Sequence, residues 1–159
     1  MKLAAITLCL FAAPAFAQGW PVVPDPAKTP GEVRALTKDQ ICATKWGKDE
    51  RLVTAAMKEE VYKAYGVPIT ARHITVNGKV SSAFEVDHLI SRELGGADSV
   101  KNLWPEPYTG PWNAHMKDKL ENKLHVEVCA GRVDLAVAQK LISGDWRVPY
   151  AKYYGQSAQ

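Results

Sequence analysis

Two histidines, two aspartates and two asparagines fall within one stretch of the chain, FEVDHLISRELGGADSVKNLWPEPYTGPWNAH, which runs from Phe84 to His115. Asp87 and His88 are adjacent, and Asn102 follows a Gly-Gly loop. A neutral imidazole can act as a base near neutral pH, and a carboxylate with a second imidazole can bind a divalent cation. A base that activates water and a cation that neutralises phosphoryl charge together suit hydrolysis of a phosphodiester.

Phosphodiester hydrolysis suggests a role for each of these residues. We expect His88 to be the general base, and Asp87 and His115 to bind the metal ion. Asn102 is expected to hold the loop around His88 through its side-chain amide, which fixes the direction of the imidazole. Asn113 is an alternative ligand that replaces or joins His115. Neighbouring residues on a strand point to opposite faces, so Asp87 and His88 share a site only if the strand ends there or the scissile group lies over its edge.

The order and spacing of these residues resemble the HNH, or His-Me finger, nucleases. The resemblance rests on D87-H88, L89-I90, G95-G96, N102-L103 and H115 occurring together, and the surrounding pattern extends it roughly from Thr37 to Trp146. It implies a ββα-metal motif, and it implies the same role of general base for His88. The cysteine pairs that bind structural zinc in many HNH proteins are absent from this chain.

We therefore expect an enzyme, a metal-dependent endonuclease that cuts DNA, or RNA as well, with low sequence specificity. Mixed oxygen and nitrogen ligands favour Mg²⁺ or Mn²⁺, with Zn²⁺ and Ni²⁺ as alternatives. Two other functions remain as alternatives. One is a non-catalytic module that binds nucleic acid or another polyanion at the cell envelope, and the other is an envelope protein with a structural ion.

The charge and the aromatic residues near the motif bear on a nucleic-acid partner. The formal net charge of +3 is too small to require or exclude a polyanion. Tryptophan and tyrosine near the prolines either stack on bases or pack in the core. The basic residues that are candidates for phosphate contacts are Arg92, Lys101, Lys117, Lys119 and Lys123, and the aromatic ones are Trp104, Tyr108 and Trp112.

The N-terminus and the cysteines indicate the compartment. Lys2 precedes a short apolar stretch that ends in the small-residue pattern of a signal peptide, so we expect residues 1–17 to be removed after Ala17 and the protein to be secreted or periplasmic. No other segment is apolar enough to span a membrane. Cys42 and Cys129 then remain, and we predict a disulfide between them, with two separate buried thiols as the alternative. Such a bridge stabilises the fold by up to roughly 4 to 5 kcal/mol in the chain-entropy model.

Hydrophobic periodicity and turn residues predict an α+β fold, a mostly helical single domain around the ββα-metal motif with a β-hairpin at Asn77-Gly78. We expect the mature chain to be a monomer. The expected division is a Pro-rich flexible leader over 18–36, the nuclease-like domain over 37–150 and a C-terminal tail over 151–159. Helices are predicted after Thr37, over 48–65, between Pro111 and Gly131 and over 135–143, and strands over 74–76, 84–86 and 102–104, the last stopped by Pro105 and Pro107.

Overall fold

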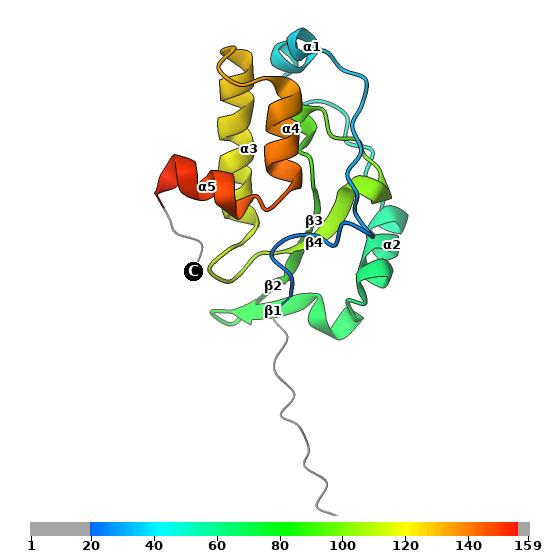
Figure 1. Ribbon diagram of the computed structural model, residues 1–159. Coiled ribbons are helices and arrows are strands. Elements are labelled where there is room, and N and C mark those ends of the chain that lie inside the picture. Colours follow the sequence, from blue (N-terminus) through cyan, green and yellow to red (C-terminus); the bar gives the residue numbers. More distant parts are fainter. Residues whose placement is uncertain (1–19, 156–159) are drawn as a thin grey trace, which may run out of the picture.

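The computed structural model describes residues 20–155, so the predicted signal peptide lies outside the described residues. Helices and strands are both present, which agrees with the predicted α+β class (Figure 1). The helices are α1 (Lys38–Ala43), α2 (Ala55–Tyr65), α3 (Ala114–Cys129), α4 (Leu135–Ser143) and α5 (Arg147–Tyr154), and the strands are β1 (His73–Val76), β2 (Lys79–Ser82), β3 (Phe84–His88) and β4 (Leu103–Pro107). Single turns of 3-10 helix lie at Ile69–Ala71, Arg92–Leu94 and Val100–Asn102.

The strands form two separate antiparallel pairs, β1 with β2 and β3 with β4. The prediction that Pro105 and Pro107 stop the second motif strand is wrong, because β4 continues through both prolines. In the register of the pair, Pro105 lies opposite Val86 and Pro107 opposite Phe84. These positions alternate with the hydrogen-bonded pairs, so the missing proline N–H removes no bond from the ladder.

Local signals set the ends of several elements. Thr37 and Gln40 form the predicted capping box at the start of α1. Asn77, with φ of 51°, and Gly78, with φ of 75°, make the hairpin turn between β1 and β2. Helix α2 is shorter than predicted and begins after Thr54, whose side chain accepts the N–H of Met57. The residues before Thr54 are instead extended, and the N–H of Leu52 donates to the side chain of Asp98.

The main core lies between α3, α4, α5 and the face of the β3–β4 motif (Figure 1). Trp112, Trp146 and Tyr150 pack edge to face, with ring centroids 5.5 to 6.2 Å apart. Trp104 and Trp146 are completely buried. Over residues 20–155, none of the helices combines the length and the hydropathy that crossing a bilayer requires.

Two segments expected to lie outside the domain are part of it. In the predicted leader, Thr29 is fully buried and donates to the carbonyl of Leu103 at 2.9 Å, and the carbonyl of Val22 accepts the indole N–H of Trp146 at 2.8 Å. The prolines that suggested flexibility keep this segment extended, which leaves its backbone free to bond to the core. At the other end, α5 includes residues 151–154 of the predicted tail, because Tyr150 and Tyr153 pack against the core.

Cys42 of α1 and Cys129 of α3 form the predicted disulfide. It closes a loop with a sequence separation of 87 residues. We expect the Cys42→Ser, Cys129→Ser double variant to be less stable than the oxidised wild type by about 2 to 4 kcal/mol, since the bridge restricts the unfolded chain. Urea unfolding of both proteins measures the difference. Equal midpoints would show that the bridge adds nothing to the stability of this fold.

Candidate functional site

An open polar hollow of about 210 Å³ lies where β3 ends, between the loop before α2, the loop after β3 and the first turns of α3. Asp87 and His88 line it, as the sequence predicts for a shared site. Most of the other lining side chains are charged, and acidic ones outnumber basic ones. They are Asp49, Arg51, Glu85, Arg92, Glu93, Asp118 and Glu121, with Trp46, Gly47 and Ser91 completing the wall.

His88 is held by a carboxylate that the sequence did not reveal. Its Nε2 lies 2.7 Å from Oδ1 of Asp98, in the loop between β3 and β4. The imidazole is 3 % exposed, and burial lowers its pKa although the Asp87 and Asp98 carboxylates act in the opposite direction. A neutral ring that donates from Nε2 to Asp98 carries its free lone pair on Nδ1. Among residues 20–155, the bond from Nε2 to Asp98 is the only side-chain hydrogen bond of this ring.

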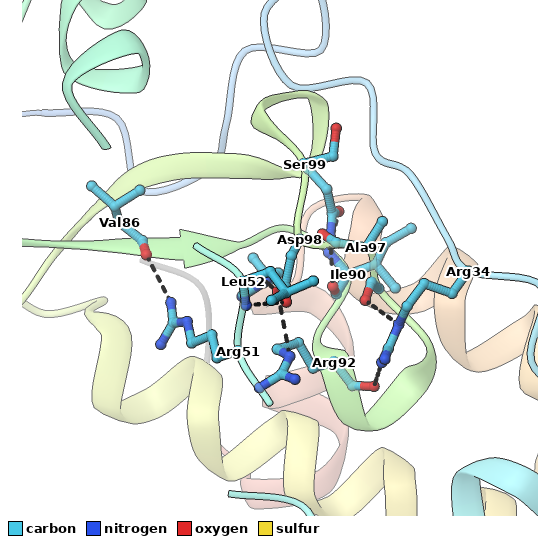
Figure 2. Close-up of polar contacts among 12 residues, drawn as sticks. Arg34, Arg51, Leu52, Val86, Ile90, Arg92, Ala97, Asp98 and Ser99 are labelled. Atoms are coloured by element: carbon cyan, nitrogen blue, oxygen red, sulfur yellow. Dashed lines mark hydrogen bonds and ion pairs between the residues drawn. The ribbon is translucent and has the colours of Figure 1, made fainter. Parts of the chain in front are cut away.

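Asp98 is itself fixed by two other segments (Figure 2). Its Oδ2 accepts the backbone N–H of Leu52 at 2.8 Å, and the guanidinium of Arg92 lies 3.3 Å from Oδ1. Burial opposes ionisation of Asp98, but these bonds and the one from His88 outweigh it and lower the pKa. The bond to Leu52 holds the chain extended before α2, and Arg51 donates to the carbonyl of Val86 at 3.2 Å (Figure 2).

Asn102 makes the loop contacts expected of it. Its Oδ1 accepts the N–H of Ile90 at 3.0 Å, and its Nδ2 donates to the carbonyls of Ile90 at 3.0 Å and Ala97 at 3.1 Å. Gly96 is needed beside it, because a Cβ there would lie 1.7 Å from the carbonyl oxygen of Ile90. The amide thus ties both arms of the loop that follows His88. That catalysis depends on these hydrogen bonds of Asn102 remains a prediction.

Asp87 contacts a buried lysine. Lys117 of α3 is completely buried, and its Nζ donates to Oδ2 of Asp87 at 2.7 Å and to the carbonyl of His88 at 2.6 Å. The same ammonium group also donates to Glu121 and lies 3.9 Å from the buried carboxyl of Glu106. The lysine therefore joins the end of β3 to α3.

One ammonium group cannot balance three carboxylates. Lys117 lowers the pKa of Asp87 against the effect of burial, which keeps Asp87 ionised. Burial, together with the neighbouring carboxylates, raises the pKa of Glu121 and of Glu106. The pKa of Lys117 is raised, because these carboxylates outweigh the burial of the amine. Burial and mutual repulsion thus disfavour the charged forms of Glu106 and Glu121, while Asp87 keeps its ion pair with Lys117.

Two acidic side chains that the sequence did not mark lie in the wall of the hollow. Glu93 and Asp118 line it together with Asp87, and the pKa of Glu93 is raised to about 7, first by burial and then by Asp118. Burial and then Asp87 also raise the pKa of Asp118. Within the described chain, Oε1 of Glu93 is buried and has no hydrogen-bond partner. Carboxylate oxygens are the ligand type of Mg²⁺ and Mn²⁺, but the ligand atoms of Asp87, Glu93 and Asp118 do not all lie within 4.8 Å of one another.

The structure does not bring His115 into the hollow. This residue is exposed on the first turn of α3, its ring 5.5 Å from that of Tyr108, and it is not part of the wall. Asn113 is the N-cap of α3, where its side chain accepts the N–H of Met116. Neither His115 nor Asn113 lines the hollow, so the structure does not bring the expected metal ligands together with Asp87.

Several residues expected to contact nucleic acid are buried or form ion pairs within the protein. Lys117 is buried in its carboxylate cluster, and Arg92 is paired with Asp49 and Asp98. Trp104 and Trp112 are buried in the core, where they cannot stack on bases. Lys101 and Lys119 remain exposed.

Sequence reasoning missed Asp98, Glu93 and Asp118 as parts of the site. A signal for the last was present, since Asp118 and Glu121 are three residues apart on the helix that directly follows the motif. Nothing local marked Asp98 as the partner of His88. Comparison of the chain with protein-family models, with curated proteins and with solved structures gives no match.

Proposed function

We propose that this protein is an exported, HNH-type, metal-dependent endonuclease that hydrolyses the phosphodiester bonds of DNA, or of RNA as well, with low sequence specificity. The observation that carries the proposal is the pairing of His88 with Asp98 at the edge of an acidic hollow. The sequence resemblance to HNH nucleases supports it. The disulfide supports an oxidising compartment, secreted or periplasmic.

His88 is the general base of the proposed reaction. Because Asp98 accepts from Nε2, the ring is held in one tautomer and one direction, and Nδ1 takes the proton from the attacking water. Burial lowers the pKa of His88, so the ring is neutral and able to accept a proton at neutral pH. Asn102 is a positioning residue, because it fixes the loop that carries Asp98.

A divalent ion is the implied cofactor, with Mg²⁺ or Mn²⁺ favoured by the oxygen donors. Asp87 would hold it, and Glu93 and Asp118 supply further carboxylates in the same wall, although the ligand atoms of the three do not all lie within 4.8 Å of one another; His115 lies outside the wall. When bound, the ion supplies positive charge to the phosphoryl and leaving oxygens. Lys117 donates to Oδ2 of Asp87 at 2.7 Å and keeps this carboxylate ionised.

A second function is favoured by one observation. Lys117 already neutralises Asp87, and a chain that satisfies this carboxylate internally has less need of a metal ion. On that reading the protein is a non-catalytic module that binds nucleic acid or another polyanion. It would then bind through exposed side chains such as Lys101 and Lys119.

Cleavage of supercoiled plasmid by the purified mature chain tests the two functions. We expect nicked and linear products with Mg²⁺ or Mn²⁺ and none with EDTA, because the acidic hollow needs a cation before it can receive a phosphate. A gel-shift assay with a short duplex in EDTA runs in parallel. Binding without cleavage under every ion tried would select the binding module, and neither activity would reject both.

A further inference from the structure

A second cluster of ligating side chains lies beyond the hollow, at the C-terminal end of α3. His125 and Cys129 are one helical turn apart on α3, and Cys42 reaches them from α1. The two sulfurs and one imidazole nitrogen all lie within 4.8 Å of one another. All three residues are half-buried.

We propose that reduction of the Cys42–Cys129 disulfide converts this cluster into a binding site for a thiophilic divalent ion such as Zn²⁺, with Cys42, His125 and Cys129 as its ligands. The site is distinct from the oxygen-lined hollow of the proposed nuclease, and the inference does not depend on that function. Two thiolates and one imidazole are ligands that Zn²⁺ prefers, and three protein ligands leave a fourth position for water.

The geometry supports this ligand set. Nε2 of His125 lies 3.4 Å from Sγ of Cys129. With Zn–S of about 2.3 Å, Zn–N of about 2.0 Å and a tetrahedral angle, the two ligand atoms of a zinc site stand about 3.5 Å apart. The imidazole is therefore already at the separation from sulfur that the metal requires. The two sulfurs must move apart. They are covalently bonded in the disulfide, whereas two sulfurs on one tetrahedral zinc ion lie about 3.8 Å apart.

The imidazole also packs against an aromatic ring. The ring of Trp46 packs edge to face against His125, with centroids 6.4 Å apart. Trp46 is anchored in turn, since its indole donates to the carbonyl of Ile41 at 3.0 Å and the guanidinium of Arg34 lies over its ring. A ligand whose direction is fixed before the metal arrives loses less freedom on binding.

The conversion has a balanced chemistry. A dithiol reductant gives two electrons and two protons to the disulfide, which becomes two thiols while the reductant becomes a disulfide itself. Binding of Zn²⁺ then releases the two thiol protons and forms two Zn–S bonds and one Zn–N bond. His125 contributes a lone pair without a change of oxidation state.

Metal titration of the mature protein tests the site. The protein is reduced with a phosphine, which takes oxygen from water and leaves no competing thiol, and is titrated with Co²⁺ and Zn²⁺. We expect one ion per reduced chain, thiolate-to-cobalt absorption in the near ultraviolet, and no such signal from oxidised protein. His125→Ala should weaken binding by at least about a hundredfold, since losing residues that only orient ligands already costs about 10- to 100-fold.

His73→Ala is the matched control, because His73 lies on the exposed hairpin strand β1. Circular dichroism follows the fold at each step, because the reduced chain lacks its bridge. Zinc should raise the unfolding temperature of reduced wild type and leave that of reduced His125→Ala unchanged. Equal affinity in wild type and His125→Ala would overturn the proposal, and so would a reduced chain that is unfolded and stays unfolded with zinc.

Discussion

Replacing His88 with alanine is expected to lower the rate of plasmid cleavage by about 100- to 10,000-fold, the usual contribution of a positioned general base. The variant loses the only imidazole that lines the hollow in the described chain. Asp98, which now accepts from Nε2, cannot replace it, because its other oxygen is occupied by the backbone N–H of Leu52. Initial rates at saturating Mg²⁺ or Mn²⁺ measure the effect, with DNA binding measured separately in EDTA.

His73→Ala provides the matched control for this experiment, because it removes a histidine from the exposed strand β1 and should leave the rate unchanged. Urea unfolding of both variants separates loss of chemistry from loss of fold. A stable His88→Ala protein that cuts as fast as wild type would exclude His88 as the base. It would also assign the observed cleavage to another source.

Replacing Lys117 with methionine is expected to destabilise the protein by about 3 to 5 kcal/mol, the usual effect of removing one member of a buried ion pair. Methionine has a similar length but no charge, so Asp87 is left buried without its counter-ion. The carbonyl of His88 and the carboxyl of Glu121 also lose a donor. Urea unfolding at neutral pH, followed by circular dichroism, gives the difference in free energy.

The effect of Lys117→Met should shrink in acid. In the wild type the folded pKa of Asp87 lies below its ordinary value of 3.8, so the ion pair stabilises the fold above that pH and this contribution is lost as the pH falls further. Lys119→Met is the matched control, since Lys119 is exposed on the same helix and should cost little. A difference below about 1 kcal/mol at neutral pH would contradict the buried ion pair, because that is the range of exposed pairs.

The sequence by itself determined the features that depend on near neighbours. The capping box of Thr37 and Gln40 joins residues three apart, and the hairpin turn at Asn77-Gly78 needs only backbone conformations that these two residues tolerate. The pairing of Cys42 with Cys129 followed from counting, because two cysteines allow a single bridge. The adjacency of Asp87 and His88 also placed both at the end of one strand.

Tertiary structure alone decided which side chains complete the site. Leu52 bonds to Asp98 across 46 residues, and this contact, which no local pattern encodes, begins α2 later than its periodicity predicts. The sequence predicts that Lys117 faces solvent, where it could contact phosphates. In the structure it is buried against carboxylates from β3 and β4. Burial and charge partners are set by how elements pack. The side-chain contacts and pKa shifts of this candidate site therefore became visible only once α3 was placed against the strands.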